Sequence, residues 1–174
     1  PTAGEAHVVG HDLRRATGAA KSRLGYMAQK FSLYGLLSVQ QNLEFSAGVY
    51  GLEGNTRRER IAEMIETFDL GDWLSATPDS LPLGHKQRLA LACSLMHRPP
   101  VLFLDEPTSG VDPITRREFW THINGLARKG VTIMVTTHFM DEAEYCDRVA
   151  MLSRARLIAL DTADALKRSA ASPE

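Results

Sequence analysis

The sequence predicts an α/β fold in which a mostly parallel sheet is flanked by helices and a helical subdomain is inserted into the chain. Two observations predict it. Apolar strands at Val101–Leu104 and Val131–Val135 enclose a helical segment, and the three together have the length of one βαβ unit, about 30 residues. Between residues 35 and 77, apolar side chains recur at every third or fourth position and no strand candidate interrupts them.

The amino-terminal part contributes short strands to the α/β body and then gives way to helices. We expect strands at Glu5–Val9 and Arg23–Met27, joined by an alanine-rich helical link. A first helix of the insertion begins at Ser38, and a second carries an apolar face over residues 61–68. A third helix, Gln87–His97, is strongly apolar and is stopped by a pair of prolines.

The βαβ unit follows the insertion. Val101–Leu104 is a continuous apolar run, which is typical of a strand buried on both faces, and Val131–Val135 is a second such strand. Between them, Asp112 supplies an N-cap and Pro113 stands at the first helical position, so a helix is expected to begin there.

The carboxyl-terminal part should add a small closing element. A short acidic helix is expected at Met140–Cys146, and Val149–Leu152 with Leu157–Leu160 should form a hairpin. The organisation that we expect is an α/β core at residues 1–34 and 99–167, a helical subdomain at 35–98 and a polar tail at 168–174.

Composition excludes several classes of function. Apolar residues make up 44% and charged residues 24%, values of an ordinary soluble domain, and the formal net charge of −1 gives no basic surface for a nucleic-acid partner. Cys93 and Cys146 lack metal-ligand spacing, which favours reduced thiols in the cytosol. No apolar run approaches the roughly 20 residues of a bilayer span, so membrane association should come through a partner.

Three side chains with hydrolytic chemistry should meet at one edge of the sheet. Asp105 and Glu106 follow the first strand of the βαβ unit, and His138 follows the second. Parallel strands open their carboxyl ends on the same edge, where open α/β sheets bind ligands. One carboxylate can hold Mg²⁺ through water, its neighbour can orient or deprotonate an attacking water, and the histidine can stabilise charge on a transferring phosphate.

Each of these residues also has an ordinary structural interpretation. An Asp-Glu pair after a strand can simply cap the next helix, and a Thr-His pair can simply end a strand. The combination, inside the run VLFLDEPTSGVD at 101–112, favours the functional interpretation.

That run resembles the Walker B strand and D-loop of ABC transporter ATPases. The resemblance implies a P-loop-NTPase-like fold, ATP and Mg²⁺ as cofactors, Asp105 as the Mg²⁺ residue, Glu106 as the catalytic carboxylate and Asp112 as the D-loop aspartate. His138, within VTTHFMDEAEYCDRV, matches the family's switch histidine. Gln29, within GYMAQKFSLYGLLSVQQNLEF, matches the glutamine that contacts Mg²⁺ and the attacking water.

The chain departs from the family pattern first at the phosphate-binding loop. No G-x-x-x-x-G-K-[ST] run occurs, although that loop cradles the phosphates in this class. We expect the native protein to begin earlier and this chain alone to be inactive; the alternative is a natural domain without the loop.

The second departure lies in the signature segment, which usually reads LSGGQ. Here it reads Leu81-Pro82-Leu83-Gly84-His85, followed by Lys86 and Gln87. The resemblance implies nucleotide contact from three of these residues, which are Gly84, Lys86 and Gln87. In the family the helix that opens here faces the γ-phosphate held by the opposite ATPase domain, through anion binding at a helix N-terminus. Pro82 lacks a hydroxyl and Leu83 adds bulk, so this half of the composite site could be active, slow or silent.

The resemblance covers the chain from residue 1 to about 167 and implies the ATPase of an exporter branch with tandem ATPase domains. The partners would be transmembrane permease subunits and a second ATPase domain, and the location the cytoplasmic face of the inner or plasma membrane. Phe31, Leu33 and Tyr34 could line a groove for the permease, or could simply pack the helical subdomain. Two other functions stay open: a soluble ribosome-associated ATPase, and a regulatory domain with a degenerate ATP site.

Overall fold

The structure, a computed structural model, describes residues 4–12 and 17–171. The chain divides into two compact units, residues 1–136 and residues 137–174, and each is described by itself.

The first unit is built on a parallel three-stranded sheet with the strand order β3-β4-β5. Its strands are β3 (Leu24–Met27), β4 (Val101–Asp105) and β5 (Thr132–Thr136). In the register of the sheet, Met27 of β3 pairs with Leu104 of β4, which pairs with Val135 of β5. All three strands therefore end at the same edge, as the sequence predicts.

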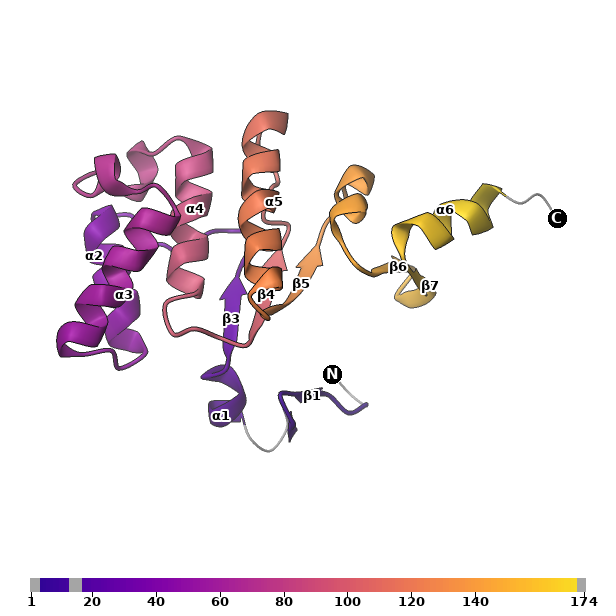
Figure 1. Cartoon of the computed structure of the whole chain (residues 1–174), viewed down its shortest axis with the longest axis horizontal. Helices are drawn as coiled ribbons and strands as arrows, with labels where there is room; N and C mark the ends of the chain where they lie inside the picture. Colours follow the sequence, from indigo (N-terminus) through magenta and orange to yellow (C-terminus); the bar gives the residue numbers. More distant parts are fainter. Residues whose placement is uncertain (1–3, 13–16, 172–174) are drawn as a thin grey trace. The chain divides into compact units, whose positions relative to one another are not determined.

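The predicted βαβ unit is confirmed by helix α5 (Pro113–Arg128), which connects β4 to β5 (Figure 1). Asp112 is its N-cap, and one carboxylate oxygen accepts from the backbone N–H groups of Ile114 and Thr115 at 3.0 and 3.1 Å. Phe119, Trp120 and Ile123 form its buried face. Gly130 lies in the connection between α5 and β5, and its φ of +91° favours glycine.

Within the first unit, helices cover one face of the sheet and the other face carries exposed side chains, so the prediction that β4 and β5 are buried on both faces does not hold among these residues. Leu102 and Leu104 are fully buried and lie in the same rows as Gly25 and Met27, against α4. Tyr26, in the neighbouring row, is 60% exposed and Met134 is 57% exposed. Apolar composition alone could not reveal this difference, because it does not say which face a helix will cover.

The insertion is helical, as predicted, and its helices gather at one side of the first unit (Figure 1). Helix α2 (Val39–Val49) begins in a capping box formed by Ser38 and Gln41. Helix α3 (Gly54–Thr67), two 3₁₀ turns and helix α4 (Leu83–Ser94) follow; the turns are η1 (Gly71–Trp73) and η2 (Pro78–Ser80). Helix α4 begins four residues before the predicted Gln87, because Pro82 is an extended N-cap and Leu83 already has helical backbone.

Buried Arg60 of α3 ties the insertion to the end of α4. Its Nε donates to the Met96 carbonyl at 3.0 Å and its Nη2 to the Leu95 carbonyl at 2.5 Å. Its Nη1 lies 2.7 Å from Glu63, and the hydrogen bond from Arg60 is the main reason that the pKa of that carboxyl is lowered. Arg60 thereby bonds to two carbonyl groups just after α4, of which that of Leu95 also accepts from the Arg98 N–H at 3.0 Å.

Replacing Arg60 with methionine should destabilise the protein while keeping most of the apolar stem. Loss of the donors removes the side-chain bond to the Met96 carbonyl and one of the two bonds to the Leu95 carbonyl. The cost is about 2 kcal/mol, which corresponds to a melting temperature lower by roughly 5 °C. Calorimetry of Arg60→Met beside Arg58→Met, an exposed control on the same helix, measures it. Equal melting temperatures for the two variants would contradict the role.

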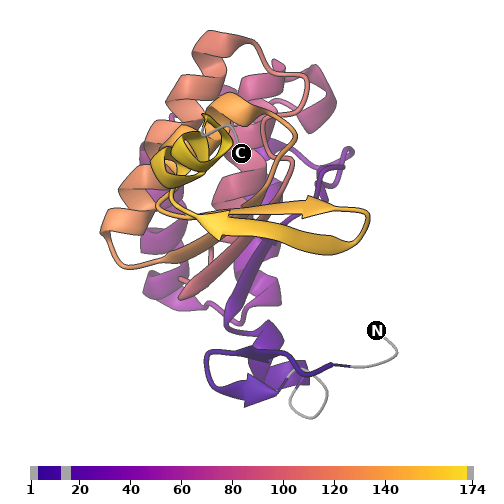
Figure 2. The same cartoon turned by 90° about the vertical axis from the view of Figure 1, so that its right-hand side faces the viewer.

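The remaining elements are short. Before the sheet lie β1 (His7–Val8), paired antiparallel with β2 (His11–Asp12), and helix α1 (Thr17–Lys21). The second unit contains η3 (Met140–Tyr145), the predicted hairpin of β6 (Val149–Ser153) and β7 (Arg156–Asp161), and helix α6 (Ala163–Ala171) (Figure 2). Residues 168–171, predicted as part of a polar tail, continue α6 instead, because Ala170 and Ala171 prolong the helical pattern. Residues 172–174 lie outside the described part of the chain.

Among the described residues, no helix is both long and apolar enough to cross a bilayer.

Candidate functional site: the carboxyl edge of the sheet

Two residues far apart in the sequence meet at the carboxyl edge of the sheet. Gln29 follows β3 and Glu106 follows β4, and the two strands are neighbours. The Gln29 Nε2 donates to Glu106 Oε2 at 2.9 Å across 77 positions of sequence. The site residues predicted after these two strands are therefore in direct contact.

The backbone of Glu106 is strained and firmly held. Its φ is +44°, in the left-handed region that non-glycine residues rarely occupy. Its N–H donates to the Thr136 carbonyl at 3.0 Å, and its carbonyl accepts from the Ser109 N–H at 3.1 Å. Strained residues persist where surrounding bonds over-determine them, and they are common at functional sites.

Asp105, the last residue of β4, is held by a partner that the sequence analysis missed. The Thr136 hydroxyl donates to Asp105 Oδ1 at 2.5 Å. The two residues are paired in the β4–β5 register. The alternation of side chains along strands predicts that Asp105 has a partner on the neighbouring strand. The identity of that partner depends on the β4–β5 register, which cannot be read from the sequence.

The donor set at this edge fits Mg²⁺. It offers oxygen ligands from the two neighbouring carboxylates of Asp105 and Glu106. Magnesium is commonly held by one or two carboxylates together with water and substrate phosphates.

Gln87 does not fit its predicted nucleotide contact. The side chain has no exposed surface, and its Nε2 donates to the Pro107 carbonyl at 2.5 Å. Because Pro107 directly follows Glu106, Gln87 links helix α4 to the turn that carries the carboxylate. The signature pattern gave its position in the sequence, but not that it lies on the buried face of the helix.

The start of α4 borders a cavity of about 360 Å³ shared with the D-loop segment and α5. Leu83, Gly84 and Asp112 all line it, together with Gly110 and Thr115. The site residues predicted from the signature and the D-loop are thus split: Gly84 and Asp112 share this cavity, whereas Gln87 lies in the interior.

Gly84 is packed too closely for any side chain. A Cβ at this position would lie 2.4 Å from Thr115 Cγ2. Thr115 also helps to define the cap of α5, because bonds from its hydroxyl and its N–H lower the pKa of Asp112. The signature helix and α5 are therefore in contact through Gly84 and Thr115.

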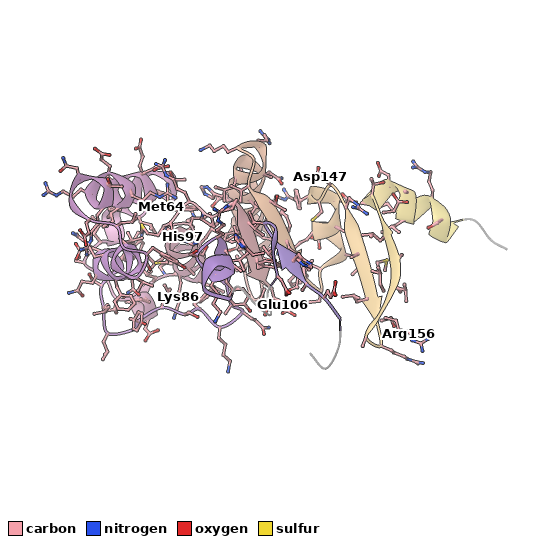
Figure 3. The ribbon with its side chains drawn as sticks, turned by 90° about the horizontal axis from the view of Figure 1, so that it is seen from below. Met64, Lys86, His97, Glu106, Asp147 and Arg156 are labelled. Carbon is pink, nitrogen blue, oxygen red and sulfur yellow. The ribbon has the colours of Figure 1, made fainter. Side chains whose placement is uncertain are left out.

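Lys86 is on the helical side of the unit, away from the strands beside which Glu106 is labelled (Figure 3). Its Nζ lies 2.8 Å from Asp79 Oδ1. Neighbouring His85 rests against the ring of Trp73, with centroids 4.9 Å apart. The structure thus gives both residues partners within the helical insertion.

His138 belongs to the second unit, where its ring lies 4.2 Å from that of Phe139. Its approach to Glu106 stays a prediction from the sequence.

A second cavity, of about 270 Å³, lies where the segment after β3 meets helices α2 and α4. Its lining contains no charged side chain and is rich in aromatic ones, and it includes Tyr26, Leu33, Tyr34, Phe45, Tyr50 and Cys93. Burial raises the pKa of the Cys93 thiol to about 11, so this cysteine stays protonated at neutral pH. Cys93 and Cys146 are both free thiols.

Comparison with known proteins identifies the family. The ABC transporter family profile matches residues 1–109. The chain belongs to the ABC transporter family. A relative from Escherichia coli, named "probable multidrug ABC transporter ATP-binding protein YbhF", is 63% identical over the whole chain, and the match covers 30% of that protein. The daunorubicin resistance ATP-binding protein DrrA3 of Streptomyces coeruleorubidus is 40% identical over 96% of the chain and 53% of its own length.

Solved ABC proteins share the fold. The structure of cbiO1 from Clostridium perfringens, described as part of the ABC transporter complex cbiONQ, matches 98% of the chain and 70% of its own with a TM-score of 0.87 and 25% identity. A dimeric ATP-binding cassette, MJ0796, in a post-hydrolysis state bound to ADP and Pi, matches 94% of the chain and 75% of its own with a TM-score of 0.82 and 25% identity. The P-loop-NTPase-like fold expected from the resemblance is confirmed for this ABC domain.

Proposed function

We propose that this ABC domain is part of an exporter ATPase, in which hydrolysis of Mg-ATP at the carboxyl edge of the sheet drives transport across a membrane. The observation that carries the proposal is the 2.9 Å hydrogen bond from Gln29 to Glu106. It joins two side chains of hydrolytic chemistry beside Asp105, at the edge where open α/β sheets bind ligands.

Each residue of this edge has a distinct role in the proposal. Asp105 holds Mg²⁺, which would neutralise charge on the phosphates of ATP. Glu106 orients the attacking water and accepts its proton. The Gln29 amide fixes the Glu106 carboxylate and contacts the same water, and His138 supplies a donor for charge that develops on the transferring phosphate.

The signature half of the site would serve a second ATPase domain. In this assignment Gly84 lets the start of α4 approach the phosphates, Asp112 contacts the opposing domain, and Lys86 adds positive charge nearby. The cavity of about 360 Å³ between α4 and α5 supports an interface at this place. Leu83 is 39% exposed at this cavity, so its side chain adds bulk where the phosphates would approach. This observation favours the regulatory alternative.

A transmembrane permease subunit would dock on the uncharged cavity beside the segment that follows Gln29. A partner of apolar character suits it, because no lining residue is charged and aromatic rings such as Tyr34 and Phe45 stand 4.4 Å apart at its border. The protein would then lie on the cytoplasmic face of the membrane through this contact, with no nucleic-acid partner. The relatives named for multidrug and daunorubicin resistance support an exported small molecule.

Membrane recruitment separates the exporter from a ribosome-associated ATPase. In the native-length protein, Phe45→Asp should move most of the protein from the membrane fraction and abolish stimulation of Mg-ATP turnover by the permease, because it places a charge in the uncharged cavity. Leu36→Asp is the matched control, since Leu36 is 97% exposed and does not line the cavity. Recovery of the wild-type protein with ribosomes rather than membranes would refute the exporter.

A further inference from the structure

Thr136 touches both carboxylate residues of the candidate site through one hydroxyl and one carbonyl group. It ends β5 and is paired with Asp105 in the register of the sheet. Its hydroxyl donates to Asp105 Oδ1 at 2.5 Å. A threonine hydroxyl has one proton to donate and can accept at the same time.

Two oxygen atoms of Thr136, that of its carbonyl and that of its hydroxyl, accept a hydrogen bond from Glu106. The Glu106 N–H is shared between the Thr136 carbonyl at 3.0 Å and the Thr136 Oγ1 at 3.2 Å. That N–H belongs to the residue with the left-handed φ of +44°. One side chain therefore orients the Asp105 carboxylate and supports the strained backbone that directs Glu106 towards Gln29.

We propose that Thr136 is a positioning residue of the Mg-ATP site: its hydroxyl fixes the Asp105 carboxylate for the divalent cation and holds the Glu106 backbone in place. The inference rests on the proposed function of this edge. A partner that orients a metal-binding carboxylate preserves its geometry and basicity, and removal of such a partner costs about 10- to 100-fold in metal affinity or activity.

The competing explanation is a strand end whose hydrogen bonds only stabilise the fold. Thr136 is exposed, so water can replace a lost hydroxyl at Asp105 and the effect on stability should be small. Valine has nearly the same shape and retains the β-branched preference for strands. A change from threonine to valine therefore separates orientation of the carboxylates from support of the strand.

The experiment compares Thr136→Val, Thr136→Ser and Thr132→Val in the native-length protein. Thr132 begins the same strand and is also exposed, but it is paired with Val101, so Thr132→Val repeats the chemical change far from the carboxylates. Three quantities are measured: binding of Mn²⁺ by electron paramagnetic resonance in the presence of a non-hydrolysable ATP analogue, the Mg²⁺ concentration for half-maximal ATP turnover, and the melting temperature.

Thr136→Val should weaken Mn²⁺ binding and raise the half-maximal Mg²⁺ concentration by about tenfold, with a melting temperature close to that of Thr132→Val. Thr136→Ser should recover most of the lost affinity because it restores the hydroxyl. Unchanged Mn²⁺ binding in Thr136→Val would overturn the proposal. A loss as large in Thr136→Ser would also overturn it, since the hydroxyl would not be responsible.

Failure of the inference is distinguishable from failure of the proposed function. If Glu106→Gln abolishes turnover but Thr136→Val binds Mn²⁺ as the wild type does, only the role of Thr136 is wrong. If the wild-type protein neither binds Mn²⁺ with nucleotide nor hydrolyses ATP, both are wrong. Should Thr136→Val unfold, Thr136→Ala removes the same hydroxyl without introducing bulk and is subject to the same criteria.

Discussion

Replacing Glu106 with glutamine should lower ATP turnover by the native-length protein at least tenfold, while ATP still binds. Glutamine has the shape of glutamate and can still accept the hydrogen bond from Gln29, but it cannot take a proton from water. General-base catalysis contributes roughly 10²- to 10⁴-fold to hydrolytic rates, so the expected loss lies well outside experimental error. Phosphate release and equilibrium binding of a fluorescent ATP analogue measure the two quantities separately.

Glu59→Gln provides the matched control, because Glu59 is an exposed carboxylate on α3 that lies neither at the sheet edge nor in the lining of either cavity. Turnover within twofold of wild type in Glu106→Gln would mean that hydrolysis does not occur at this edge. The regulatory interpretation would then be preferred.

The second large effect is expected at Gly84, where alanine should push the signature helix away from α5. The new Cβ would lie 2.4 Å from Thr115 Cγ2, and threonine is stiff about its first side-chain torsion. Overpacking of this kind costs about 1–3 kcal/mol. We expect a melting temperature lower by several degrees and turnover reduced by about tenfold, since a displacement near 1 Å can cost far more than that in rate.

Thr115→Ser provides the rescue. It removes the methyl group that a Cβ on residue 84 would meet and keeps the hydroxyl that bonds to Asp112; the other Thr115 atoms are 3.7 and 3.8 Å from that Cβ. The double variant Gly84→Ala/Thr115→Ser should therefore recover stability and turnover together. Gly125→Ala, which meets nothing within 4 Å, controls for the alanine itself. A fall in stability with unchanged turnover would show that the signature half does not contribute to catalysis.

Much of the fold could be predicted from local chemistry. The Asp112-Pro113 cap, the two apolar strands and the closing hairpin depend on residues close in sequence, and the structure has each of them. The open face of the sheet and the true start of α4 could not be predicted in the same way. Both depend on which helix packs against which strand, and apolar runs such as Val131–Val135 look the same whether one face or two are covered.

The residues of the candidate site were likewise predictable from the sequence only in part. The sequence placed Asp105, Glu106 and His138 at one edge because parallel strands share a carboxyl end, whereas Gln29 was assigned through the family resemblance. Gln29 and Glu106 prove to be hydrogen-bonded. It did not predict Thr136, which becomes a partner of Asp105 only through the β4–β5 register. It assigned Gln87 to the nucleotide because the signature pattern gives the position of the residue in the sequence but not the face of the helix on which its side chain lies.

The most direct test of the central claim is whether Gln29 and Glu106 act on the same step. Gln29→Ala is made in the wild-type and Glu106→Gln backgrounds of the native-length protein, and single-turnover hydrolysis of Mg-ATP is measured for all four proteins. Residues that act as a unit have strongly non-additive effects. If the edge of the sheet is the hydrolytic site, Gln29→Ala should slow wild-type hydrolysis about tenfold and change the Glu106→Gln rate little. Equal slowing in both backgrounds would mean that the two residues act independently, which would contradict a shared site.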